Sequence, residues 1–293
     1  MSWRTCWLGA ALFAALMASG AQAEPYDHGL LWRIDKPGVA PSYVFGTLHS
    51  ADPRVTTLAP PVAQAFARSR TFATEVYLSD VADARFFEAM QFEDSRRLEP
   101  MLGADGYARL KLALGDTAPP EDVLARTKPW AALLRVTAPN PPADGATLDA
   151  ELVAIARTRR MTILGLEWLD EQIAALDDIP LDTQLALLRH AIDDHAGLAA
   201  QLEPTIQAWL KRDLVALSHI NRAAEAHDPE LATHYAVLTR RIVDNRSVVM
   251  AYRLFLPLRA GKVFVAVGAL HLYGEQGLLA LLRQQGYQVR RVY

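Results

Sequence analysis

KVFVAVGALH, from Lys262 to His271, is an apolar run followed by glycine, two further residues and a histidine. SYVFGTLH, from Ser42 to His49, repeats this order near the other end of the chain. A short run rich in β-branched and aromatic residues predicts a buried strand, and the glycine allows a tight exit from it. Each stretch is therefore expected to deliver a histidine to the end of a strand.

A helical pattern and a second strand follow each of these stretches. After the first come a helix at Val62–Arg70 and a strand at Phe72–Tyr77, which carries Glu75 towards its end. After the second come a helix at Glu275–Gln285 and a strand at Tyr287–Tyr293. Strand–helix–strand units favour parallel strands joined by right-handed crossovers. The sequence predicts an α/β fold whose central, mainly parallel sheet is built from two strand–GxxH–helix–strand units.

The middle of the chain, about 80–260, predicts a mostly helical insertion within a single domain that spans 24–293. One more strand is expected inside it, at Met161–Leu166. The predicted helices are Glu121–Thr137 with a break at Pro129, Leu148–Arg159, Leu181–Leu202, Pro204–Lys211 and Pro229–Leu256. The run Pro139–Pro142 predicts a loop.

The first 23 residues are expected to be a signal peptide that is removed. Arg4 precedes an apolar run, Trp7–Met17, and Ala21-Gln22-Ala23 resembles a cleavage site. The apolar run is too short to span a membrane. The mature protein is therefore predicted to be periplasmic or secreted, without a stable membrane span.

The composition limits which side chains can form a reactive or metal-binding site. Cys6, inside the predicted signal peptide, is the only cysteine, so the mature chain has neither a disulfide nor a thiolate site, and a metal would need His, Asp or Glu ligands. The formal net charge is −3, and Lys and Arg are dispersed, which gives no indication of nucleic-acid binding. The histidines at 190, 195, 219, 227 and 234 are expected to be solvated.

His49, His271 and Glu75 form the best candidate site. Ligands of open parallel sheets bind beyond the carboxyl ends of the strands, where all three residues are expected. Two histidines and a carboxylate are suitable ligands for a divalent metal with an open position for water, and such a metal suits hydrolysis. Without metal, the same residues can serve as base and acid.

The chain resembles the TraB/GumN family, which is related to the Tiki membrane proteases and the erythromycin-esterase/ChaN-like group. The matching motifs span nearly all of the mature chain. They are Gly46-Thr47-Leu48-His49, Glu75, Gly165-Leu166-Glu167, Arg246, Val267-Gly268-Ala269-Leu270-His271-Leu272, Gly274 and Gly286-Tyr287-Gln288-Val289.

The resemblance implies a metal-dependent hydrolase. His49, Glu75, Arg246 and His271 would line one site, with His49, Glu75 and His271 as ligands of Mn, Co or Zn. Arg246 would stabilise substrate charge. Supporting positions would be Gly46, Thr47, Glu167 and Gly268.

Three nearby residues leave alternatives open. Ser247 stands where the family often has Asn, and a change at a supporting position would lower activity. Asp149 matches a family aspartate, but an acidic residue at a helix start also suits the helix dipole. Glu167 has either a site role or a pairing or capping role at the helix that follows.

Two functions are consistent with these residues. The first is a periplasmic metal-dependent hydrolase, with peptidase activity as its expected form and a peptide or small molecule as its ligand. The second is a non-catalytic periplasmic protein that sequesters a peptide or a haem-like ligand in the same cleft. The sequence does not indicate an oligomeric state.

Overall fold

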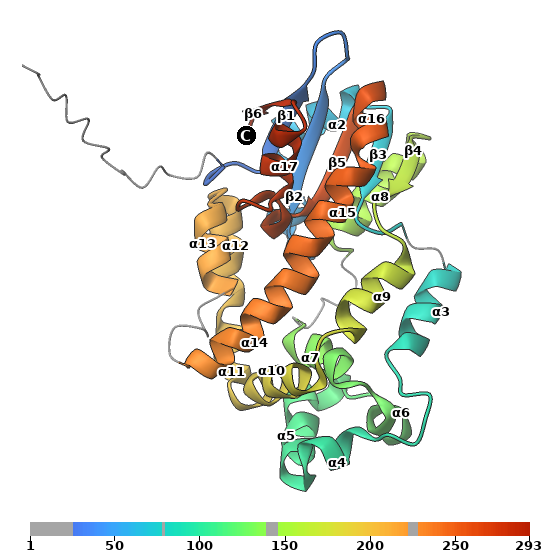
Figure 1. The fold of residues 1–293 in the computed structure, drawn as a ribbon, viewed down its shortest axis with the longest axis vertical. Coiled ribbons are helices and arrows are strands. Elements are labelled where there is room, and N and C mark those ends of the chain that lie inside the picture. The colour runs from blue at the N-terminus through green and yellow to red at the C-terminus, as the bar shows by residue number, and fades with distance from the viewer. Residues whose placement is uncertain (1–25, 78–79, 139–145, 222–227) are drawn as a thin grey trace, which may run out of the picture.

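The computed structural model describes residues 26–77, 80–138, 146–221 and 228–293. The predicted signal peptide at 1–23, the loop at 139–142 and His227 lie outside these ranges. Within them, a sheet with its covering helices forms one half of the molecule, and a group of helices forms the other (Figure 1).

Six strands form one sheet in the order β4-β3-β5-β2-β1-β6. They are β1 (Leu31–Asp35), β2 (Ser42–Thr47), β3 (Thr71–Thr74), β4 (Thr162–Gly165), β5 (Val263–Gly268) and β6 (Gln288–Arg291). β4, β3, β5 and β2 are mutually parallel, whereas β1 is antiparallel to both β2 and β6. The predicted α/β class with a mainly parallel sheet and a mostly helical insertion is confirmed.

Seventeen α-helices lie in the described ranges. They are α1 (Pro53–Thr56), α2 (Pro60–Arg68), α3 (Asp80–Ala89), α4 (Leu98–Leu102), α5 (Ala104–Leu114), α6 (Glu121–Arg126), α7 (Pro129–Thr137), α8 (Leu148–Thr158), α9 (Leu169–Asp177), α10 (Leu181–Asp193), α11 (His195–Ala200), α12 (Leu202–Leu210), α13 (Leu214–Asn221), α14 (Pro229–Thr239), α15 (Asn245–Arg253), α16 (Phe255–Ala260) and α17 (Leu278–Gln284).

Two predicted long helices are interrupted. The helix expected at Leu181–Leu202 is divided at Asp194 into α10 and α11. The helix expected at Pro229–Leu256 contains a π-helical turn, Arg240–Asp244, between α14 and α15. A π turn carries one extra residue per turn and is found frequently at functional sites. Here it directly precedes Arg246.

The two GxxH strands, β2 and β5, are neighbours at the centre of the sheet. Their register pairs Gly46 with Val267 and Thr47 with Gly268. The two predicted units are therefore interleaved, because β5 lies between β2 and β3. The connection from β2 leads towards β4 and the connection from β5 leads towards β6. This makes the β2–β5 pair the topological switch point, where open α/β sheets form their binding crevice.

Right-handed crossovers in opposite directions place helices on both faces of the sheet. In Figure 1, α15, α16 and α17 lie in front of the sheet, and α2 and α8 lie behind it. Every residue of β2 is buried, as is every residue of β5 except Gly268. Phe66 of α2 packs edge-on against Phe264 of β5, with ring centroids 4.9 Å apart. This two-sided burial explains why both strands are continuous apolar runs.

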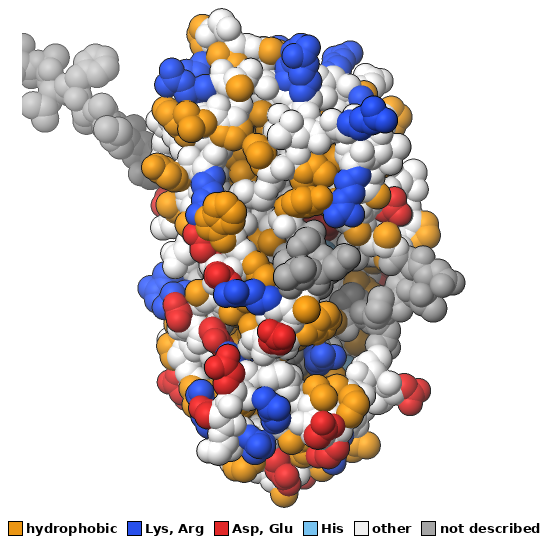
Figure 2. All heavy atoms as spheres, turned by 90° about the vertical axis from the view of Figure 1, so that its right-hand side faces the viewer, with side chains coloured by type: hydrophobic (Ala, Val, Ile, Leu, Met, Phe, Trp, Pro, Cys, Tyr) orange, Lys and Arg blue, Asp and Glu red, His pale blue; other side chains and the backbone are white. Residues whose placement is uncertain are grey.

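The helical half has its own apolar core. Buried leucines of α4, α5, α6 and α10 pack together there, among them Leu98, Leu110, Leu124 and Leu188. The helix formed by α14, the π turn and α15 runs from this half to the sheet (Figure 1). On the face in Figure 2, Lys and Arg side chains are spread singly, with acidic side chains between them in the lower half. In the ranges that the structure describes, no helix has the length and apolarity needed to cross a membrane.

Candidate functional site

A cleft of about 370 Å³ lies at the carboxyl ends of β2 and β5. Both GxxH histidines, His49 and His271, line it together with Glu75 and Arg246. The structure thus brings together the four side chains that the sequence nominated as catalytic. Thr47 and Gly268 also line the cleft.

His271 is buried and held in one orientation. It lies in a 3₁₀ turn, Ala269–Leu272, that begins directly after β5. Ser247 donates its hydroxyl proton to the carbonyl of Val243 (2.8 Å), and the hydroxyl oxygen lies 2.9 Å from His271 Nδ1. Because that hydroxyl proton is already used, Nδ1 carries the ring proton, and Nε2 presents a lone pair.

Burial lowers the pKa of His271 below its usual value, although the charge of nearby Glu75 opposes this effect. The ring is therefore neutral at pH 7. Its Nε2 lies 3.8 Å from Glu75 Oε1. A neutral imidazole oriented by a hydrogen bond at its other nitrogen is the usual form of a metal-binding or proton-accepting histidine.

Ser247 therefore contacts the ring of His271 from the position where the family often has Asn. We expect Ser247→Ala to lower the free energy of unfolding by about 1–2 kcal/mol, because it removes a hydrogen-bond partner from a buried ring. Urea denaturation measures the loss, and the pKa of His271 followed by NMR reports whether the ring keeps its environment. A variant with unchanged stability and unchanged His271 resonances would show that Ser247 does not hold the ring.

Glu75 follows directly after β3 and links three elements. Its Oε1 accepts a hydrogen bond from the backbone N–H of Gly268 (2.7 Å), and its Oε2 accepts one from Arg246 Nη2 (2.6 Å). Burial acts to raise the pKa of Glu75, but the charge of Arg246 and the hydrogen bonds from Arg246 and the Gly268 N–H lower it. Glu75 is therefore an anion, and as a base it is weaker than an ordinary glutamate.

Arg246 lines the cleft and already contacts two carboxylates, and its role in stabilising substrate charge stays a prediction. Its Nε and Nη2 both donate to Glu167, with Nη2 2.7 Å from Oε2, and Nη1 donates to the carbonyl of Ile242 (3.1 Å). Glu167 is only 4% exposed, and burial raises its pKa. The guanidinium compensates both anions, and Glu167 pairs with Arg246 rather than capping the helix that follows it.

His49 differs from His271 in being open to solvent, with 82% of its side chain exposed. Its Nδ1 lies 3.4 Å from Asp149 Oδ2, and Asp149 Oδ1 accepts a 2.6 Å hydrogen bond from the hydroxyl of Thr47. The interaction with Asp149 raises the pKa of His49 above its usual value. His49 and Asp149 thus form a dyad suited to proton transfer near neutral pH.

Asp149 is the residue whose role the sequence left undecided. It does lie in the first turn of α8, as expected of a charge that suits the helix dipole, but its carboxylate points to Thr47 and His49. The family match was the signal that favoured a site role. Spacing alone gave none, because Asp149 and Thr47 lie 102 residues apart.

Gly46 keeps the two histidine loops in contact. A Cβ at this position would lie 2.8 Å from Leu272 Cδ1 and 3.0 Å from Ala269 Cα, so the turn that carries His271 would have to move. We expect Gly46→Ala to lower the free energy of unfolding by about 1–3 kcal/mol. Gly106→Ala is the matched control, since its Cβ meets only Leu102 Cβ at 3.4 Å. The control should be unchanged or up to about 1 kcal/mol more stable. Equal losses in urea denaturation would contradict the packing argument.

The donor atoms around the cleft suit a divalent metal ion. His271 Nε2 and the exposed His49 ring supply imidazole nitrogens, and Glu75 supplies a carboxylate. Asp149 Oδ2 is buried and has no hydrogen-bond partner. Nitrogen and carboxylate ligands of this kind suit Zn, Mn or Co. Within the described ranges, no three His, Cys, Asp or Glu side chains are already grouped for coordination.

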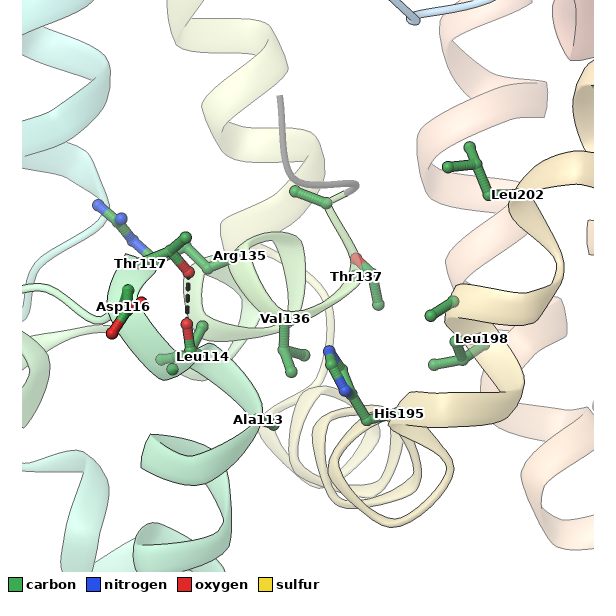
Figure 3. Close-up of a pocket in the computed structure, with 13 residues that line it drawn as sticks. Ala113, Leu114, Asp116, Thr117, Arg135, Val136, Thr137, His195, Leu198 and Leu202 are labelled. Atoms are coloured by element: carbon green, nitrogen blue, oxygen red, sulfur yellow. Dashed lines mark hydrogen bonds between the residues drawn. The ribbon is translucent and has the colours of Figure 1, made fainter. Parts of the chain in front are cut away.

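A second cavity, of about 360 Å³, lies in the helical half. Figure 3 shows His195, from the start of α11, pointing into it beside Val136, and Thr117 donating a hydrogen bond to the Leu114 carbonyl. None of its lining residues belongs to the predicted site.

The expectation of solvated histidines is wrong for two of them. His234 Nδ1 lies 2.9 Å from the Thr183 hydroxyl, and His190 packs edge-on against Tyr235. Both rings are half-buried where α10 meets α14. Neither lines the cleft.

Comparison with known proteins agrees with the resemblance. The model of the TraB/PrgY/gumN family matches residues 30–291. Among curated proteins, the uncharacterized proteins YbaP of Escherichia coli (strain K12) and of Shigella flexneri are each 29% identical over 137 residues, covering 46% of this chain and 47% of the relative. The match thus spans about half the length of these relatives. No solved structure gives a significant match. Because the family model covers nearly all of the described chain, this protein belongs to the TraB/PrgY/gumN family.

Proposed function

We propose that this protein is an exported, metal-dependent hydrolase that cleaves peptides. The observation that carries the proposal is the convergence of the two GxxH histidines with Glu75 in one cleft at the sheet's switch point. The Nδ1 atom of each histidine faces another side chain: Ser247 Oγ lies 2.9 Å from that of His271, and Asp149 Oδ2 lies 3.4 Å from that of His49. That arrangement leaves both Nε2 atoms for ligation or proton transfer.

The residues divide the chemical roles between them. His49, His271 and Glu75 would hold the metal ion, which when bound lowers the pKa of water and polarises a carbonyl. The Asp149 carboxylate would keep a proton at His49 Nδ1, so that Nε2 presents its lone pair to the ion. Neutral His271 keeps an unprotonated Nε2 in the cleft. Arg246 fixes Glu75 in position and balances the negative charge.

The experiment is to measure metal content and peptide cleavage on the same samples. The full chain is purified from an exporting host, stripped with chelator and reloaded with Mn, Co or Zn. We expect one bound ion per chain and cleavage of a fluorescence-quenched peptide library. Both should be lost in His49→Ala and His271→Ala. His219→Ala is the matched control, because His219 is an exposed histidine of α13 outside the cleft.

The same samples test the alternative of non-catalytic sequestration. A metal-free protein that retains a peptide or haem, with uptake unchanged in His49→Ala and His271→Ala, would contradict the hydrolase proposal and favour sequestration. Metal bound equally well by both variants would contradict the proposed ligands.

Export is tested by the mass of the mature protein. The proposal predicts that the mature protein begins at Glu24, after Ala21-Gln22-Ala23. Intact-mass analysis of the periplasmic fraction of an expressing bacterium should give the mass of residues 24–293. A chain that keeps its first 23 residues in the cytosol would contradict export.

A further inference from the structure

The cleft adjoins an apolar chamber of about 250 Å³ inside the helical half. Trp130 and Leu134 of α7, Leu187 of α10 and Leu238 of α14 are among the side chains that line it. An apolar cavity of about 150 Å³ is large enough to admit benzene, so this chamber has room for a large side chain.

Three residues line both the chamber and the cleft: Gln201, Ile220 and Ile242. Ile242 belongs to the π-helical turn, and its carbonyl accepts a hydrogen bond from Arg246. The turn that holds the charged cluster therefore also lies where the two spaces adjoin. A ligand seated at the histidines lies beside the chamber.

The chamber offers few free polar groups to a ligand. The side chain of Gln184 is used within the wall, since Oε1 accepts from the Trp130 backbone N–H (3.1 Å) and Nε2 donates to the Ile179 carbonyl (2.7 Å). The other polar side chains that line it, Thr137, Gln201 and Tyr235, are uncharged, so a charged group placed there would lose its water without gaining a counter-charge. An apolar group would gain free energy with each carbon that it buries.

The chamber also adjoins the cavity of Figure 3. Thr137 and Leu198 line both the chamber and the cavity of Figure 3.

We propose that the chamber is a specificity pocket that takes a large apolar side chain of the peptide whose backbone lies at His49 and His271. The assignment rests on the proposed hydrolase function in naming the peptide a substrate. It goes beyond that function in stating which peptides the protein prefers: those with leucine, phenylalanine or tryptophan next to the cleaved bond, ahead of those with glycine, alanine or a charged residue.

The test measures binding without turnover. Chelator-stripped full chain is titrated calorimetrically with the peptides acetyl-Gly-X-Gly-Gly-amide, where X is Ala, Leu, Phe, Trp or Asp. We expect X = Leu to bind roughly 50-fold more tightly than X = Ala, because three more carbons are buried at about 0.8 kcal/mol each. X = Asp should bind no better than X = Ala. Equal affinities across the series would overturn the proposal.

Filling the chamber should abolish this preference. Leu238→Trp is expected to reduce the difference between X = Leu and X = Ala to less than threefold, while X = Ala still binds. Leu134→Trp, on the opposite helix, is a second filling variant in case the first does not fold. Leu112→Trp is the matched control, since Leu112 is 80% exposed on α5 and lines none of these cavities. A preference for leucine that persists in both folded filling variants would overturn the proposal.

N-octanoylglycinamide separates a peptide side chain from an acyl chain as the occupant. If it binds more tightly than every peptide of the series, the chamber takes acyl chains and the proposal is overturned. If only the hydrolase proposal is wrong, affinity will still increase with the size of the apolar side chain X, but no peptide will be cleaved after the protein is reloaded with metal. Cleavage that does not depend on X would leave the hydrolase standing and remove the specificity pocket.

Discussion

Arg246→Met is expected to lower the free energy of unfolding by about 3–5 kcal/mol, the largest stability loss that we predict. Removing one partner of a buried ion pair leaves the other charge uncompensated. Here one guanidinium contacts two carboxylates, Glu167, which is 4% exposed, and Glu75. Methionine keeps much of the side-chain length, so the loss reports the charge more than the packing. Urea denaturation at pH 7 measures it.

The control for Arg246→Met comes from the same helix. Arg253 also pairs with a glutamate, Glu171, but both side chains are far more exposed. Arg253→Met should therefore cost no more than about 1 kcal/mol. The double variant Arg246→Met/Glu167→Gln should recover part of the loss, because one of the stranded carboxylates is then neutral. Equal effects of the two arginine substitutions would contradict the buried-cluster account.

The loss in Arg246→Met also has a predicted pH dependence. Burial already raises the pKa of Glu167 in the native protein, and removal of the guanidinium raises it further. A carboxyl whose folded pKa lies above its unfolded pKa destabilises the fold as pH rises past the unfolded value. The deficit of the variant against wild type should therefore be greatest at pH 7 and should shrink as the pH falls towards about 4. A deficit that grows on acidification would contradict this assignment.

Asp149→Asn is expected to lower peptide cleavage about 10–100-fold, which is the range for loss of the partner that orients a metal-binding histidine. Asparagine can still accept the hydrogen bond from Thr47, but its amide presents an N–H to His49 Nδ1. The ring would then carry its proton on Nε2, the atom that faces the chemistry. The carboxylate charge that raises the pKa of His49 is lost as well.

The effect on His49 can be measured without turnover. In the metal-free protein, NMR titration should give a His49 pKa above 6.5 in wild type and a lower value in Asp149→Asn. Asp170→Asn is the control, because Asp170 forms an exposed pair with Arg85 and neither residue lines the cleft. An unchanged His49 pKa in Asp149→Asn, or an equal loss of cleavage in Asp170→Asn, would contradict the dyad.

The strands that carry the site could be predicted because the determining signals are local. In β2 and β5 an apolar run, a glycine and a histidine follow one another within ten residues, and burial on both faces requires such a run. The order of the strands in the sheet could not be predicted from local signals. Nothing in the 42–49 stretch indicates that β5, more than 200 residues later, pairs with it.

The partners of the site residues were the least predictable part. Glu167 and Arg246 lie 79 residues apart, and only tertiary packing determines that they meet. The two carboxylates that Arg246 contacts could not be predicted either, because a sequence does not show which anions surround a cation. The π turn was also missed, since the 3.6-residue periodicity continues on both sides of it and predicts one uninterrupted helix.

The most direct measurement of the shared site is the relaxation of histidine ring resonances by Mn²⁺ in the full chain with ¹³C-labelled histidine. If His49 and His271 bind one ion, both rings should broaden together as the first equivalent is added, while the other histidines stay sharp. His49→Ala should then remove the broadening of His271, and His271→Ala that of His49. Broadening of only one of the two rings, or of neither, would contradict the account.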